Sequence, residues 1–78
     1  MKRTKRTVLE LRKAGNRIWV DTDGFGVWGS RARIEEGFLD LYDEHDRVVA
    51  TFYLGKFDVV YPTELRHMRL LEEGVANV

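Results

Sequence analysis

The spacing most suggestive of a chemical site in this 78-residue chain is made by three glycines, Gly24, Gly26 and Gly29. They fit the pattern G-x-G-x-x-G, whose backbone approaches phosphate groups closely in dinucleotide-binding folds and in protein kinases. The first use needs a full helix after the third glycine, and the second needs a lysine and metal-binding elements. Here Gly37 ends the next segment after seven residues. The glycines therefore predict a bent or bulged strand that carries the bulky side chains of Phe25 and Trp28.

The other polar residues form no catalytic or metal-binding pattern. Asp21–Gly24 begins like a calcium loop, but its glycine comes too early, which predicts a turn. The chain has no cysteine, and its two histidines, His45 and His67, lack the spacing of a zinc site. Ser30 lacks the setting of a nucleophile elbow, and the adjacent carboxylates of residues 35–36 face opposite sides of a strand. We therefore expect no catalytic residues, no metal and no cofactor.

The side-chain charges cancel over the whole chain but are divided unequally along it. Residues 1–19 carry seven basic groups and one acidic group, whereas residues 20–78 carry six basic and twelve acidic groups. The first segment therefore has a net charge of +6 and the second a net charge of −6. An asymmetry of this kind is more informative about binding partners than the total charge is.

Short strands separated by turns account for most of the chain. Turn-forming residues recur every eight to ten positions, which is typical of antiparallel strands. The predicted strands cover residues 7–13, 17–21, 25–29, 30–36, 38–43, 47–54 and 57–61. For residues 30–36 the alternative is a short helical piece. Along the strand over residues 47–54, alternation places the side chains of four residues on the core side: Val48, Ala50, Phe52 and Leu54.

The apolar periodicity changes to that of a helix after Pro62. The apolar stripe consists of Leu65, Met68 and Leu71. It predicts one helix over about residues 64–73, with Thr63 as its N-cap and Gly74 as its C-cap. A helix of about ten residues is not stable alone in water, so the stripe is expected to pack on the sheet or on a partner.

Two groups of side chains remain that suit a binding surface. Basic residues gather near the turn of the first hairpin, and several aromatic residues alternate with core positions and so point outward. The predicted partner-binding residues are Arg12, Lys13, Arg17, Trp19, Trp28 and Tyr53. Tryptophan and tyrosine anchor many protein interfaces. The alternative is a nucleic-acid surface in which these aromatics stack on bases and N-terminal residues contact phosphates, namely Lys2, Arg3, Lys5 and Arg6.

These elements predict a mainly β (α+β) fold: a small curled antiparallel sheet or partly open barrel of five to seven short strands, followed by one short C-terminal helix. We expect residues 1–6 to form a basic, flexible tail, residues 7–61 the antiparallel β domain, and residues 62–78 the helix packed on the sheet with a short tail. Neither a signal peptide nor a membrane span is evident, so the expected location is the cytoplasm.

The predicted function is that of a small, non-enzymatic protein–protein interaction module. It would act as an inhibitor or adaptor that occludes or bridges another protein, in the style of small phage and mobile-element proteins. Nucleic-acid binding is the alternative, although the acidic body would repel phosphate. Self-association through a sheet edge or through the helix stripe is a further possibility. Each of the two features also has an interpretation without a binding role. The basic end would only keep the chain soluble, and the aromatic side chains would be buried by closure of the sheet.

Overall fold

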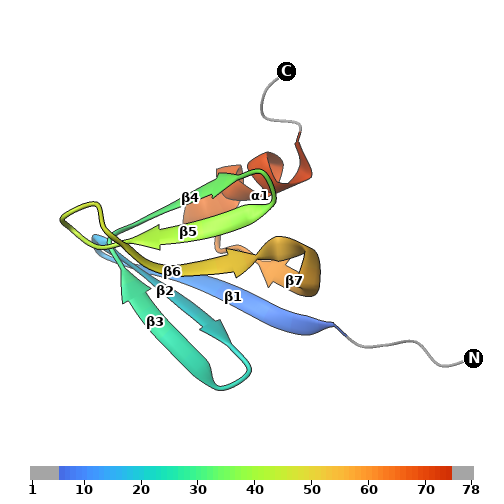
Figure 1. Ribbon diagram of the computed structural model, residues 1–78, viewed down its shortest axis with the longest axis horizontal. Coiled ribbons are helices and arrows are strands. Elements are labelled where there is room, and N and C mark those ends of the chain that lie inside the picture. The colour runs from blue at the N-terminus through green and yellow to red at the C-terminus, as the bar shows by residue number, and fades with distance from the viewer. Residues whose placement is uncertain (1–5, 75–78) are drawn as a thin grey trace, which may run out of the picture.

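The structure is a computed structural model, and it describes residues 6–74. These residues form two small sheets and one C-terminal helix (Figure 1). The first sheet has the strand order β3-β2-β1-β7 and the second the order β4-β5-β6. The strands are β1 (Thr7–Ala14), β2 (Arg17–Thr22), β3 (Phe25–Gly29), β4 (Arg31–Glu35), β5 (Phe38–Tyr42), β6 (Val48–Tyr53) and β7 (Phe57–Val60). Short 3-10 turns cover Leu54–Lys56 and Thr63–Leu65, and α1 covers Arg66–Glu73. The predicted mainly β fold with one short C-terminal helix is confirmed, and the sheets remain open rather than closing into a barrel.

Three of the hairpin turns contain only two residues each. The turn between β2 and β3 is Asp23-Gly24, and both residues have positive φ, 48° and 79°. This is the type I′ geometry that matches the twist of paired strands, and Asp-Gly is one of its preferred sequences. Gly24 is therefore a turn residue, as the failed calcium pattern indicated. Glu36-Gly37 repeats this geometry between β4 and β5, and Gly15-Asn16 joins β1 to β2 with positive φ at Gly15 alone.

The chain passes from the first sheet to the second at Ser30. The predicted strands over residues 25–29 and 30–36 are confirmed as β3 and β4. The Ser30 N–H donates a hydrogen bond to the Tyr42 carbonyl (2.7 Å). Next to it, a Cβ atom on Gly29 would lie 2.4 Å from Cγ of Leu41, far inside van der Waals contact. Glycine at position 29 thus allows a leucine of the second sheet to rest directly on the backbone of the first.

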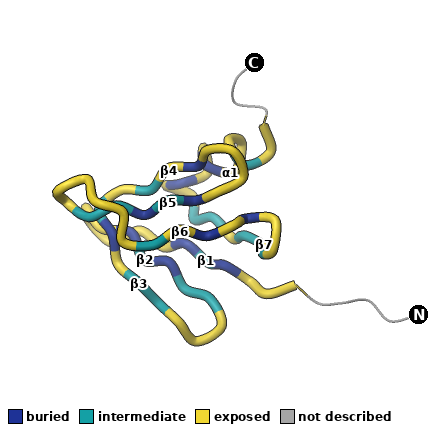
Figure 2. Tube along the Cα trace, in the orientation of Figure 1, coloured by how far each residue is buried: buried dark blue, intermediate teal, exposed yellow. Residues whose placement is uncertain are grey.

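The hydrophobic core lies between the two sheets and the helix. Alternate residues of β1, β2 and β5 supply most of the fully buried side chains, as strand geometry requires (Figure 2). The buried core residues are Leu9, Leu11, Ile18, Val20, Ile34, Leu39, Leu41, Phe52, Leu54, Leu65 and Met68. No buried side-chain polar atom in the described residues lacks a hydrogen-bond partner. Burial of apolar surface is therefore the main stabilising term in a chain without disulfides.

One prediction about β6 is wrong. Val48 was expected to face the core with Ala50 and Phe52, but its side chain is 54% exposed. The reason is a bulge: Ala50 pairs with Leu41, whereas Val48 pairs with Tyr42, so Val49 is an extra residue. The extra residue reverses the alternation at the start of β6.

The last strand, β7, pairs in parallel with β1. The turn-and-hairpin pattern of the sequence did not indicate this pairing, because it joins the two ends of the strand region. Arg6 reinforces it: its side chain donates hydrogen bonds to the carbonyl oxygens of Gly55 and Phe57 and lies 3.5 Å from the Asp58 carboxylate. Arg6 is thus held against the 3-10 turn at Leu54–Lys56 and against β7, and the flexible tail expected over residues 1–6 stays a prediction. The other members of that tail, Lys2, Arg3 and Lys5, lie outside the described residues.

The C-terminal helix packs against β4. Met68 and the preceding Leu65 are buried, whereas Leu71, the third member of the predicted stripe, is 40% exposed. Gly74 ends α1 in the left-handed conformation (φ 76°), and its N–H donates to helix carbonyls, as predicted for a C-cap. Thr63 caps nothing, because it opens the 3-10 turn and its side chain makes no capping bond. No helix among residues 6–74 is long and apolar enough to cross a membrane.

The contact between Gly29 and Leu41 generates a stability prediction. Gly29→Ala should lower the free energy of unfolding by about 1–3 kcal/mol, because the new methyl group overlaps Leu41. In a Leu41→Ala background the methyl group has room, so the same substitution should cost at least about 1 kcal/mol less. Urea unfolding followed by circular dichroism measures all four proteins of the cycle. Equal costs in both backgrounds would show that the contact does not determine how the sheets meet.

Candidate partner-binding site

The outer face of the first sheet carries a pair of tryptophans. Since Ile18 and Val20 of β2 point into the core, Trp19 between them points outward. Trp28 of β3 is its direct cross-strand partner. The two ring centroids lie 4.9 Å apart with their planes tilted by 53°, a favourable arrangement for aromatic pairs. Trp28 remains 41% exposed.

Gly26 explains why the Trp19 ring lies where it does. A Cβ atom at position 26 would lie 1.9 Å from Cζ2 of Trp19, so the indole rests on the bare backbone of β3. β3 pairs with β2 residue for residue, without the bulge expected from its glycines. The glycines of β3 thus serve close packing on both faces of the sheet: Gly26 receives Trp19 outside, and Gly29 receives Leu41 inside.

Two arginines flank the tryptophan pair. The guanidinium of Arg17 lies 4.6 Å from the centre of the Trp28 ring, within cation–π distance. Arg12 stands opposite Trp19 on β1, and both oxygens of the Glu10 carboxylate accept hydrogen bonds from it, at 3.2 and 3.3 Å. These bonds raise the pKa of Arg12 above its ordinary value. We call the surface formed by Arg12, Arg17, Trp19 and Trp28 the tryptophan face.

The structure separates the other two predicted binding residues from this surface. Lys13 alternates with Arg12 and so points to the opposite side of β1, where its ammonium group donates to the Gly15 carbonyl (3.0 Å). Tyr53 lies on the second sheet, where its ring stacks beside Phe38 at 5.3 Å. Alternation along a strand indicates which residues point away from the core, but it does not indicate which sheet carries them.

A small pocket of about 420 Å³ adjoins the tryptophan face. Arg17 and Trp28 form one wall, and Asp43 and Glu44 of the β5–β6 loop form the other. The Asp43 carboxylate accepts hydrogen bonds from the backbone N–H groups of Arg47 (2.9 Å) and His45 (2.8 Å), and these bonds hold the pKa of Asp43 below its ordinary value. The acidic loop is therefore a turn organised by Asp43.

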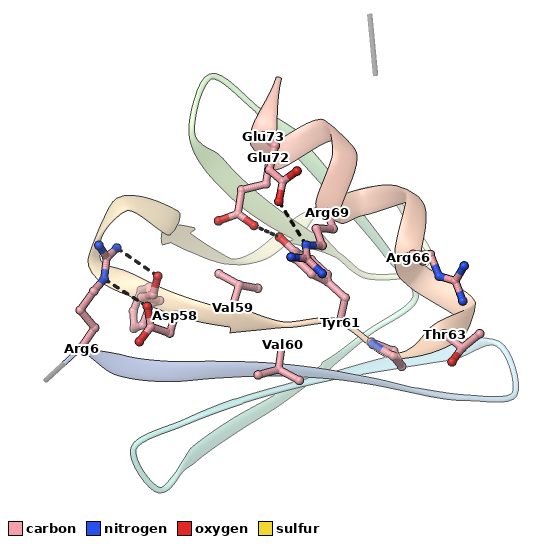
Figure 3. A pocket seen from close by; sticks show the side chains of 12 residues that line it. Arg6, Asp58, Val59, Val60, Tyr61, Thr63, Arg66, Arg69, Glu72 and Glu73 are labelled. Carbon is pink, nitrogen blue, oxygen red and sulfur yellow. Dashed lines mark hydrogen bonds and ion pairs between the residues drawn. The ribbon is translucent and has the colours of Figure 1, made fainter. Parts of the chain in front are cut away.

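A larger groove of about 660 Å³ runs between β7 and α1 (Figure 3). The Arg6–Asp58 pair lies at one end of it, and Thr63 and Arg66 lie at the other. The sequence did not indicate this groove, because it depends on the parallel pairing of β7 with β1.

Most polar groups around the groove are paired with one another. The Tyr61 hydroxyl donates a hydrogen bond to the Glu72 carboxylate (2.7 Å), and Arg69 lies 3.1 Å from Glu73. Burial, together with this bond to Glu72, raises the pKa of Tyr61 well above its ordinary value. The Tyr61–Glu72 bond fastens α1 to the segment that follows β7, whereas the Arg69–Glu73 pair lies within α1.

Groups of possible metal ligands were sought among residues 6–74. In this part of the chain no three side chains of histidine, aspartate or glutamate come together as metal ligands would. Comparisons of the chain with protein-family models, with curated proteins and with solved structures found no match. The function of the chain is therefore inferred from the chemistry of the surfaces described above.

The Tyr61–Glu72 bond generates a prediction about alkaline stability. Because the pKa of Tyr61 is raised by folding, its contribution to stability is complete below the ordinary tyrosine pKa of about 10 and declines as pH rises above it. Tyr61→Phe should therefore remove part of the loss of stability seen between neutral pH and about pH 11. Thermal melting across this range measures it, with Tyr53→Phe as the matched control. If Tyr61→Phe and wild type lose stability in parallel, the tyrosine is not shielded as described.

Proposed function

We propose that this chain is a small non-enzymatic protein-binding module that docks on a partner protein through the tryptophan face. The observation that carries the proposal is the Trp19–Trp28 pair, which is seated on Gly26 and lies outside the core with Arg17 stacked against it. Trp28 exposes 41% of its surface beside the half-buried Trp19, so a partner that covers the pair would remove apolar surface from water. Acting as an inhibitor or adaptor, the chain would cover a functional surface of its partner or join it to another protein.

The residue types of the tryptophan face suit a protein interface. Tryptophan and arginine are enriched among the residues that contribute most to binding energy. Here the side chains are ordered before binding: Trp19 is held by Gly26 and Trp28, Arg12 is held by Glu10, and Arg17 stacks on Trp28. Ordering in advance reduces the entropy lost on association.

The charges on this side of the first sheet favour a protein over a nucleic acid. Arg12 and Arg17 are balanced there by Glu10 and Asp21, which are direct partners across β1 and β2. Nucleic-acid surfaces instead collect unbalanced positive charge along a groove. The matching partner surface has apolar side chains for the indoles and a carboxylate within reach of Arg17.

An affinity experiment with matched variants tests this proposal. The wild-type chain, Trp28→Ala and the control Tyr53→Ala are used to capture proteins from lysate of the native host, and captured proteins are identified by mass spectrometry. We expect a partner retained by wild type and Tyr53→Ala and lost by Trp28→Ala. With the purified partner, Trp28→Ala should weaken binding about 30-fold, equivalent to about 2 kcal/mol. Retention by Trp28→Ala, with loss by Tyr53→Ala, would assign binding to the second sheet.

A separate fluorescence titration tests the alternative that the chain binds nucleic acid. Fluorescence of Trp19 and Trp28 is followed while single- and double-stranded oligonucleotides are added at low salt. We expect no saturable change. A change that saturates and weakens steeply as salt is added would contradict the proposal and favour a nucleic-acid surface that includes the basic N-terminal residues.

A further inference from the structure

The four free strand edges of the two sheets differ in how they are protected. Proteins keep exposed edges from pairing by means of charges, bulges or covering elements. β7 carries Asp58, which is paired with Arg6, and β4 has charged residues and is contacted by α1. β6 is interrupted by the bulge at Val49. Among residues 6–74, none of these protections is found at β3 along Phe25–Gly29, at the outer edge of the first sheet (Figure 1).

We propose that β3 pairs with β3 of a second copy of this chain, antiparallel, about a two-fold axis at Val27. The two first sheets then form one continuous sheet of eight strands across the dimer. This register matches large side chains with glycines: Phe25 faces Gly29, Gly26 faces Trp28, and Val27 faces Val27. When two copies of the segment Phe-Gly-Val-Trp-Gly run in opposite directions, each large aromatic side chain therefore stands opposite a glycine.

The side chains that already lie against these glycines provide the contact surface. Trp19 leans over Gly26 toward the edge, so Trp28 of the second copy packs beside its ring on the outer face. Leu41 lies against Gly29 on the inner face, where Phe25 of the second copy meets it. Phe25 is 56% exposed in the single chain, and the pairing gives it an apolar neighbour.

The charges at the two ends of β3 also match in this register. The turn residue Asp23 precedes β3, while Arg17, the residue before Ile18, stands at the far end, where Ile18 pairs with Gly29. The Arg17 guanidinium leans over Trp28, toward the free edge. Antiparallel pairing brings Asp23 of each copy to the Gly29 end of β3 in the other copy, where Arg17 stands. The two-fold axis produces this contact twice.

The dimer described here is weak and reversible. A single pair of five-residue strands buries an area at the small end of specific protein interfaces. The two tryptophan faces then lie side by side on the outer face of the eight-stranded sheet, with Trp28 of each copy next to the new strand pair, which would strengthen attachment to a partner with two sites. The inference stands independently of the proposed function, because it requires no other protein.

Single cysteines test the register directly, since the natural chain contains none. In Val27→Cys the two sulfur-bearing residues meet at the axis, where opposed Cα atoms of antiparallel strands lie about 4.5–5.5 Å apart, within disulfide range. The controls are Val49→Cys on β6 and Val60→Cys on β7, the neighbouring free edges. Under mild oxidation, non-reducing gels should show a covalent dimer of Val27→Cys forming at least about ten times faster than either control dimer.

Sedimentation equilibrium of the wild-type chain provides a second reading that does not depend on any variant folding. We expect the mass to rise from monomer to dimer with concentration and to stop there. Phe25→Lys, which adds a charge to the edge, should lower the dimer fraction, while the matched control Phe38→Lys on the second sheet should not. A monomer at all concentrations, growth beyond the dimer, or equal cross-linking at the three cysteine positions would overturn the proposal.

Discussion

The close approach of the Leu41 side chain to the backbone of Gly29 determines how the two sheets of this protein meet. A larger residue at position 29 would hold the sheets apart where the chain crosses from one to the other. The adjacent hydrogen bond from Ser30 to Tyr42 fixes the same crossing. With this contact in place, the inward residues of β1, β2 and β5 share one core, which must supply the stability of a chain without disulfides.

The same strand uses glycine for a second purpose on its other face. Gly26 receives the Trp19 ring, and Trp28 stands beside it with Arg17 above. The inner contact therefore serves the fold, whereas the outer contact orders side chains that the core does not need. This division explains how one short, uncharged strand can lie next to both the candidate binding surface and the candidate dimer edge.

Much of the fold was predictable because it depends on local signals. Turn-forming residues and alternation predicted the strands, Asp21–Gly24 predicted the turn before β3, and Gly74 predicted the end of α1. The parallel pairing of β7 with β1 was not predictable, because it joins segments about fifty residues apart and leaves no periodic mark. The bulge at Val49 was missed for a similar reason: register is set between strands and cannot be read along one of them.

The sequence predicted that arginine and tryptophan residues form the candidate site, but it predicted only in part which residues belong to it. Arg12, Arg17, Trp19 and Trp28 come together, but Lys13 and Tyr53 lie elsewhere, because alternation assigns a side to a residue and not a sheet. Gly26 and Glu10, which hold the tryptophan face in order, were missed. The signal available for Gly26 was a glycine in the strand that follows the one with Trp19. The glycines of that strand were instead interpreted as marking a bend or a bulge.

We propose that a partner protein covers the tryptophan face, and the solvent access of its side chains tests this most directly. Hydroxyl-radical footprinting of the chain, alone and in complex with the captured partner, measures the solvent access of individual side chains. Oxidation of Trp19 and Trp28 is expected to fall sharply in the complex, while oxidation of Tyr53 and Phe38 on the second sheet is expected to stay unchanged. Protection of Tyr53 and Phe38, with the two tryptophans as accessible as in the free chain, would contradict it.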